Sequence, residues 1–363
     1  MAMTLDELPT PCLVLDISVL KRNLAMMREA IARHPGVVLR PHMKTAKSRD
    51  VAALAAPDGG PITVSTLAEA AYFADGWRDQ IYAVGITPQK LDQVAALNAQ
   101  GADIKVITDD IDIARIIAGH PGGVRGLVEV DVGEHRGGVS PADALPIAQT
   151  MGDRLAGLFT HGGHSYAGRD VATMARIAEE ERAGVMQAAA MLRDAGLRPG
   201  IVSLGSSPTA LHAKRLDGIT EVRAGVYMFG DLFQAQLGTH PQEDIAVTVL
   251  ASVIGRRPAQ GTILLDSGGL ALSKDRATQA APRDYGFGLV LDMDARPGFG
   301  DAIIIRTHQE HGEVSPGPMQ LRVGDRVRVA PNHTCMTVAA HERYHVVDGS
   351  REVIAVWDRV NGW

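Results

Sequence analysis

Cysteine is nearly absent from this chain, which carries only Cys12 and Cys335. Two cysteines cannot build a disulfide framework, so a special role for either one points to metal or redox chemistry. The net charge of −6 offers no basic field for nucleic acid. The longest mainly apolar run, near Ile245 to Ile254, is too short to cross a bilayer, and the segment from Met1 to Glu7 lacks the regions of a secretion signal. We therefore expect a cytoplasmic protein that binds neither nucleic acid nor membrane.

The length and composition are those of a large soluble enzyme. The 363 residues exceed the ~250–300 at which a single hydrophobic core usually stops growing. Apolar residues make up 45% of the chain and charged residues 21%. The sequence thus predicts two domains, or one large barrel with an addition.

Short apolar segments alternate with helix-like segments through the first two thirds of the chain. The predicted strands are Cys12–Asp16, Val37–Arg40, Ile62–Ser65, Ile81–Val84, Ile104–Thr108, Leu127–Val132, Gly157–His161, Val202–Gly205 and Val222–Val226. The predicted helices include Ile17–Arg33, Leu67–Trp77, Pro88–Ala99, Ile111–Ile117, Ala142–Met151 and Val171–Ala195. Repeated βα units with short connections predict a parallel sheet closed into a (β/α)8 TIM barrel. The first strand is one more than the barrel needs, so we assign it as an entry strand shared with another part of the molecule.

The alternation stops near Gly238, and the rest of the chain reads as strand after strand. The predicted strands are Ile245–Ile254, Thr262–Leu265, Ala302–Thr307, Arg326–Ala330, Met336–Ala340, His345–Val347 and Val353–Trp357. We therefore expect a barrel domain over residues 10–238 and a mostly β domain over residues 239–363, with residues 1–9 possible partners of the second domain.

Lys44, in the stretch from Leu39 to Ser48, is the main candidate functional residue of the predicted barrel. An apolar run from Gly36 to Leu39 predicts a buried strand, which places Lys44 just beyond its carboxyl end, where ligands bind in such sheets. Beside Arg40, His42 and Lys47, its amine is expected to have a lowered pKa and to bond an aldehyde cofactor covalently. The alternative is a solvated basic loop.

Small residues follow two neighbouring late strands, at the place where barrels often hold a phosphate. Ser206 belongs to a run of small residues that opens a helix, and Arg223 ends the next strand before Gly225, Val226 and Tyr227. Their backbone N–H groups are candidates for holding a phosphate. Each motif is also typical of a plain turn between strand and helix.

Two further strand ends carry titratable side chains. Arg136 is a candidate contact of a cofactor oxygen, and Asp131 is expected to brace its loop, although a structural ion pair explains this loop equally well. His161 and His164 offer groups that titrate near neutral pH, with Tyr166 beside them as a further candidate cofactor contact. We expect one of the two histidines to be structural.

His333 and Cys335 form the clearest motif of the β domain. If this segment is extended, residues two apart project from one face, so an imidazole and a thiolate can share one zinc ion. The alternative is a core cysteine beside a surface histidine.

Taken together, these stretches resemble the D-threonine aldolase and eukaryotic-type D-serine dehydratase family, whose fold is the alanine-racemase type of pyridoxal phosphate enzyme. The motifs that carry the resemblance are Thr10-Pro11, Arg40-Pro41-His42-Met43-Lys44-Thr45, Asp131-Val132-Gly133 with Arg136, Gly205-Ser206, Gly225-Val226-Tyr227 and Pro331-Asn332-His333-Thr334-Cys335. The resemblance implies that Lys44 holds pyridoxal 5'-phosphate, that Gly225 and Val226 contact its phosphate, and that Arg223 is directed at its pyridine nitrogen. It further implies that His333 and Cys335 bind a divalent metal, zinc before manganese or magnesium, in a homodimeric enzyme.

The resemblance also ranks the reactions. Aldolase members carry His-x-Asp where this chain has His333-Thr334-Cys335, whereas dehydratase members carry His-x-Cys. We therefore expect a lyase that dehydrates D-3-hydroxy amino acids, D-serine or 3-hydroxy-D-aspartate, to an oxo acid and ammonia, with Lys44 removing the α-proton. The alternatives are an aldolase that gives glycine and an aldehyde, with His161 or His164 as base, a racemase, and a non-catalytic pyridoxal phosphate carrier.

Overall fold

A computed structural model describes residues 3–363, and these divide into two compact units. The barrel unit comprises Met26–Lys47, Val51–Gly225 and Gly362–Trp363. The β-rich unit comprises the described residues up to Ala25, Ser48–Asp50 and Val226–Asn361. No helix within residues 3–363 is long and apolar enough to span a membrane.

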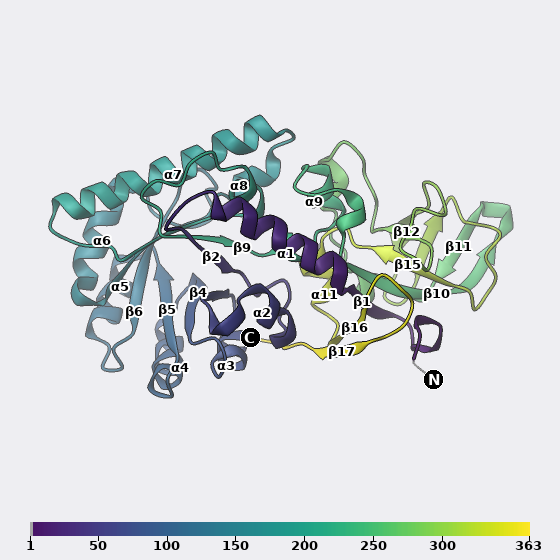
Figure 1. Cartoon of the computed structure of the whole chain (residues 1–363), viewed down its shortest axis with the longest axis horizontal. Coiled ribbons are helices and arrows are strands. Elements are labelled where there is room, and N and C mark those ends of the chain that lie inside the picture. Colours follow the sequence, from purple (N-terminus) through teal and green to yellow (C-terminus); the bar gives the residue numbers. More distant parts are fainter. Residues whose placement is uncertain (1–2) are drawn as a thin grey trace. The chain divides into compact units, whose positions relative to one another are not determined.

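Eight parallel strands form the core of the barrel unit (Figure 1). Their order is β2-β9-β8-β7-β6-β5-β4-β3, and a bridge between His42 and Thr63 links the end of β2 to β3, so the sheet is nearly closed. The predicted eightfold barrel is confirmed. The strands are β2 (Val38–Pro41), β3 (Ile62–Val64), β4 (Asp79–Gly85), β5 (Asp103–Thr108), β6 (Arg125–Val130), β7 (Leu155–Thr160), β8 (Ile201–Leu204) and β9 (Glu221–Ala224).

Helices connect these strands, as the right-handed crossovers of parallel sheets require. They are α2 (Arg49–Ala55), α3 (Leu67–Phe73), α4 (Pro88–Ala99), α5 (Ile111–Gly119), α6 (Ala144–Met151), α7 (Val171–Asp194) and α8 (Ser207–His212), and α1 (Ile17–Ala32) precedes the first barrel strand, β2. The longest, α7, begins where the Asp170 side chain accepts a hydrogen bond from the Thr173 N–H. Met174, Ala178, Val185 and Leu192 lie along its buried face at helical spacing.

A polar cluster lies at the amino ends of the barrel strands. Arg40 is buried and donates to Glu221 Oε2 at 2.8 Å and to Asp79 Oδ1 at 3.0 Å. Lys105 Nζ donates to the same Asp79 oxygen at 2.7 Å. Buried cations of this kind persist because carboxylates pair with them. Arg40 therefore holds strand ends together on the side of the sheet away from Lys44.

The β-rich unit is a mixed sheet of nine strands in the order β11-β14-β13-β12-β15-β10-β1-β16-β17. Strand β1 pairs antiparallel with β10 and parallel with β16, which confirms that Cys12–Asp16 belongs to a part of the molecule other than the barrel. The strands are β1 (Cys12–Asp16), β10 (Val247–Arg257), β11 (Thr262–Leu265), β12 (Leu289–Leu291), β13 (Ile303–Thr307), β14 (Gly312–Ser315), β15 (Arg326–Ala330), β16 (Arg343–Val347) and β17 (Ala355–Asp358). Short helices α9 (Leu232–Gln236), α10 (Gly269–Leu272) and α11 (Thr334–Val338) complete the unit.

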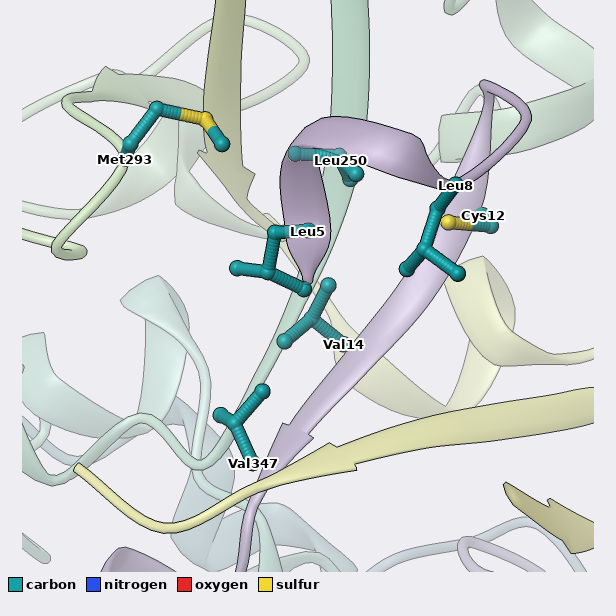
Figure 2. Packing of buried hydrophobic residues seen from close by; sticks show 7 residues of the cluster. All are labelled: Leu5, Leu8, Cys12, Val14, Leu250, Met293 and Val347. Atoms are coloured by element: carbon teal, nitrogen blue, oxygen red, sulfur yellow. The ribbon is translucent and has the colours of Figure 1, made fainter. Parts of the chain in front are cut away.

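The amino-terminal segment packs into an apolar cluster of this unit. Figure 2 shows Leu5 and Leu8 gathered with Cys12 and Val14 of β1, and Leu250 of β10 lies in the same cluster. Burying one such leucine side chain contributes about 1.5–3 kcal/mol. Met1 and Ala2, part of the segment expected to pack with this domain, lie outside the described residues.

One predicted strand is wrong. Most of the segment from Met336 to Ala340 lies in helix α11 instead. Its β-branched residues favour a strand, but two hydroxyls hold it as a helical turn: Thr334 donates to the Gly230 carbonyl and Thr337 to the Leu272 carbonyl. The prediction also missed β12 and β14.

Candidate active site

The residues predicted to contact a cofactor follow the carboxyl ends of five consecutive barrel strands. In sheet order, β2 precedes Lys44, β9 precedes Gly225, β8 precedes Ser206, β7 precedes His161, and β6 precedes Arg136. The carboxyl ends of parallel strands meet at one edge of a sheet, so the strand order brings these loops together. The loop positions predicted from the sequence are confirmed, whereas the roles of the side chains stay predictions.

Lys44 has an exposed side chain in the loop after β2. Two of the cations expected beside it are engaged elsewhere, because Arg40 binds Glu221 and Asp79 and the Lys47 ammonium lies 2.6 Å from Glu69 Oε1. The influence of these two cations on Lys44 therefore stays a prediction. His42 remains close, since the Lys44 N–H lies 3.4 Å from His42 Nδ1.

Two imidazoles near Lys44 are held in the neutral form. Burial lowers the pKa of His161 to about 3, and the positive charges of Lys44 and Arg136 act in the same direction. Burial and Lys44 likewise hold the pKa of His42 well below its ordinary value. His161 Nδ1 donates to the Gly205 carbonyl at 2.7 Å, which leaves its Nε2 as a hydrogen-bond acceptor. His161 is therefore uncharged at neutral pH but a weak base, and its catalytic role stays a prediction.

The loop after β6 is braced from within, as predicted. Asp131 Oδ1 accepts from the N–H groups of Gly133 and His135 at 2.9 and 3.1 Å. Arg136 is exposed and lies 3.3 Å from Glu134, so the ion pair considered as the alternative is present. His164 is placed beside Gly133, and its Nδ1 is buried without a hydrogen-bond partner within residues 3–363.

The loops after β8 and β9 approach neighbouring backbone too closely for side chains. Gly205 has a φ of +133°, and a Cβ there would lie 2.3 Å from the Arg223 carbonyl oxygen. A Cβ on Gly225 would lie 2.9 Å from the His42 carbonyl oxygen. Two glycines thus let adjacent strand ends pack closely, and because both are buried, their contact with a cofactor phosphate stays a prediction.

Three predicted cofactor contacts are already engaged with protein atoms. Ser206 Oγ lies 2.9 Å from Ser165 Oγ and caps α8, while the Ser206 N–H donates to Thr209 Oγ1 at 3.0 Å. Arg223 is buried against the Phe159 ring and donates to Ser203 Oγ and to the Thr160 carbonyl. Burial lowers the pKa of Arg223 to about 10. The Tyr166 backbone carbonyl accepts a hydrogen bond from the Arg169 guanidinium. Val226 and Tyr227 are buried, and both belong to the β-rich unit. A direct contact between Arg223 and the pyridine nitrogen therefore stays a prediction.

Glu181 was missed by the sequence reasoning although it is fully buried beside this site. From the buried face of α7, its Oε1 accepts from the Gly162 N–H at 2.6 Å and from the Gly205 N–H at 2.9 Å. Burial raises the pKa of this carboxyl. The side chain thus ties the loop of His161 to the loop of Ser206. The only signal in the sequence was an acidic residue on the apolar face of a predicted helix.

Glu181→Ala is expected to destabilise the protein by about 2 kcal/mol or more, because each unsatisfied buried N–H costs about 1–3 kcal/mol. Glu181→Gln keeps an acceptor oxygen and removes a buried acid, so its stability is expected to stay within about 1 kcal/mol of wild type. Thermal and urea unfolding of the three proteins measure the difference. Equal stability of Glu181→Ala and wild type would contradict this role.

His333 and Cys335 are brought together in the β-rich unit, but not by an extended segment. His333 is the extended residue that precedes α11, and Cys335 lies in the first turn of that helix. Burial acts to lower the pKa of His333, but hydrogen bonding and the charges of Cys335 and Asp231 raise it well above its ordinary value. The expected pairing of imidazole and sulfur is therefore present, produced by a strand-to-helix turn.

The pair fits a divalent metal with open coordination positions. His333 Nδ1 lies 2.9 Å from Asp231 Oδ2, which leaves Nε2 as the nitrogen able to bind a metal. Within residues 3–363 no group of three or more His, Cys, Asp or Glu side chains is arranged to hold a metal, so the protein offers one nitrogen and one sulfur here. This donor set suits zinc better than magnesium, which prefers oxygen ligands.

A groove of about 880 Å³ lies away from these residues. It is lined by segments that precede β2 and β9, including His34, Lys214 and Arg215, and by residues of α7 and α8. Because it borders the amino ends of the strands, it does not include the predicted cofactor contacts.

Comparisons with known proteins match both units. The alanine racemase N-terminal domain matches residues 15–232, and a putative serine dehydratase domain matches residues 246–347. The D-threo-3-hydroxyaspartate dehydratase of Delftia sp. (strain HT23) is 41% identical over 99% of this chain and 99% of its own length. The D-serine dehydratase of Dictyostelium discoideum is 29% identical over 96% of each chain. A solved structure of a D-threo-3-hydroxyaspartate dehydratase mutant in its metal-free form superposes with a TM-score of 0.95, at 39% identity, covering 99% of this chain and 100% of the other. The chain belongs to the family of pyridoxal phosphate-dependent lyases that join an alanine racemase N-terminal domain to a serine dehydratase domain.

Proposed function

We propose that this lyase dehydrates D-3-hydroxy amino acids to an oxo acid and ammonia, with 3-hydroxy-D-aspartate as the preferred substrate and D-serine as a poorer one. The observation that carries the proposal is the thiol of Cys335 beside the imidazole of His333, since the dehydratase members of the family carry this pair. The 41% identity to a dehydratase of D-threo-3-hydroxyaspartate supports the same substrate class.

The barrel residues supply a base, Lys44, and charged side chains around it. Pyridoxal phosphate, when bound, withdraws electrons from the substrate α-carbon. Lys44 holds the cofactor and, once its amine is released, removes the α-proton. His42 and His161 are uncharged around it, so the positive charge that acts on them comes from Lys44, Arg136 and Arg223, of which Arg136 is paired with Glu134. An anionic phosphate and the carboxylates of a hydroxyaspartate are complementary to that charge.

The β-rich unit carries the residues that would hold a divalent metal. A divalent metal, zinc in our proposal, would be held by His333 and Cys335 and would supply a Lewis acid that makes a β-hydroxyl a better leaving group. His333 contributes Nε2 and Cys335 its sulfur. The dimeric state and the cytoplasmic location expected from the sequence stay predictions.

Product analysis separates dehydration from aldol cleavage. The purified protein, supplied with pyridoxal phosphate and zinc, is incubated with 3-hydroxy-D-aspartate, D-serine or D-threonine, and ammonia, glycine and aldehyde are assayed. We expect ammonia and an oxo acid, with kcat/KM for the dicarboxylate at least about 10-fold above that for D-serine, because a site that binds a substrate carboxylate discriminates against a substrate that lacks it. Glycine and an aldehyde without ammonia would show an aldolase instead.

A further inference from the structure

Asp231 is a fully buried carboxylate that the sequence reasoning did not single out. It stands just before α9 and within the β-rich unit. Its Oδ1 accepts from the Gln234 N–H at 2.7 Å, the usual role of an aspartate at a helix start. Its second oxygen, Oδ2, accepts two further hydrogen bonds that this capping role does not require.

Oδ2 of Asp231 faces the start of α11. It accepts from His333 Nδ1 at 2.9 Å and from the Thr334 N–H at 3.0 Å. The Thr334 hydroxyl in turn donates to the carbonyl of Gly230, so side-chain and backbone bonds fix the two helix starts against each other. The imidazole of His333 is therefore held by a rigid, buried acceptor.

A carboxylate that accepts from Nδ1 determines the tautomer of His333. Because the Nδ1 hydrogen is held by the carboxylate, Nε2 is the nitrogen that loses its proton and carries the lone pair when the imidazole is neutral. Histidines that bind metals commonly donate their other ring nitrogen to a carboxylate, which fixes the ring and makes the ligand nitrogen more basic. No three-ligand group is found within the described part of the chain, so Asp231 acts beside the metal ligands and not as one of them.

We propose that Asp231 is the positioning residue of the metal centre, which sets the tautomer and orientation of His333 so that Nε2 coordinates the metal. This inference rests on the proposed metal site and adds to it a residue 102 positions away in the sequence.

Asp231→Asn tests the inference, because an amide has one accepting oxygen where the carboxylate has two, one for the Gln234 N–H and one for His333. If its oxygen caps α9, its NH2 group meets the His333 Nδ1–H, and the imidazole must turn or move its proton to Nε2. If its NH2 group meets Gln234 instead, His333 keeps only a neutral, weaker acceptor. We expect the zinc affinity, measured by competition with a chromogenic chelator, to fall by about 10- to 100-fold.

The control is Asp266→Asn in the same unit. Asp266 also accepts a backbone bond, from the Ser252 N–H at 2.8 Å, and a side-chain bond from Thr10, but its hydrogen bonds do not involve His333. We expect this variant to bind zinc as wild type does. Cofactor absorbance and the melting temperature of the metal-free proteins show whether either variant is folded.

A second measurement needs no variant. In wild-type protein with ¹⁵N-labelled histidine, the His333 signals are expected to report a protonated Nδ1 without metal and coordination through Nε2 with zinc. Coordination through Nδ1, or a folded Asp231→Asn that binds zinc as tightly as wild type, would overturn the role of Asp231 alone. Wild-type protein that binds no zinc would overturn the proposed metal site and this role with it.

Discussion

Lys44→Ala is expected to give a folded protein that no longer bonds pyridoxal phosphate covalently and whose lyase activity has fallen by at least about 10²- to 10⁴-fold. The lysine has two tasks in the proposed reaction, to hold the cofactor and to remove the α-proton. The nearest other lysine in sequence, Lys47, is bound to the buried carboxylate of Glu69 at 2.6 Å. It is therefore not free to replace Lys44.

The visible absorption spectrum with and without borohydride measures the first task, and ammonia release measures the second. Borohydride is expected to fix the cofactor on wild type and not on Lys44→Ala, which mass spectrometry of the reduced proteins shows directly. Lys214→Ala is the matched control, because this exposed lysine lines the groove at the amino ends of the strands. A Lys44→Ala protein that still carries borohydride-reducible cofactor would place the covalent link elsewhere.

The barrel could be predicted from the sequence because its signals are local. Helix α4 (Pro88–Ala99) of the barrel has the predicted bounds, as do strands β11 (Thr262–Leu265) and β15 (Arg326–Ala330) of the β-rich unit. Each is a periodic or apolar run bounded by turn residues. The strand order then followed from the handedness of βα units, and it brought the loops of Lys44, Ser206 and Gly225 to one edge.

The errors arose where distant contacts override local preference. The turn at Thr334 is helical because Gly230 and Asp231 bind it, about a hundred residues earlier in the chain. Strands β12 and β14 are short and pair with partners that their own sequences do not indicate. Local propensity does not contain this information.

The same reasoning explains which site residues were missed. A lysine or a His-x-Cys motif indicates its chemistry by residue type alone. Asp231 and Glu181 are important because of the groups that they hydrogen-bond, His333 for Asp231 and two loop N–H groups for Glu181. Asp231 precedes an apolar helix, so the sequence indicates only a cap. Its bond to His333 is visible only once the fold is known.

Cys335→Ala is expected to lose tightly bound zinc and to lower the dehydration rate by about 10³-fold, while cofactor absorbance remains. A Lewis acid at the leaving hydroxyl is worth several kcal/mol in the transition state, and about 4 kcal/mol corresponds to this factor. Chelation of wild type is expected to have the same effect, reversed by adding zinc.

Cys12→Ala provides the matched control, because the chain contains one other cysteine. Cys12 is packed with Leu5 and Leu8, and burial raises the pKa of its thiol to about 12, so it remains a neutral core group. Its replacement is expected to leave zinc content and ammonia release unchanged. Zinc analysis and the ammonia assay on the two variants therefore distinguish a metal-bound sulfur from a packed one. A Cys335→Ala protein that keeps both its zinc and its rate would mean that the sulfur beside His333 only fills space.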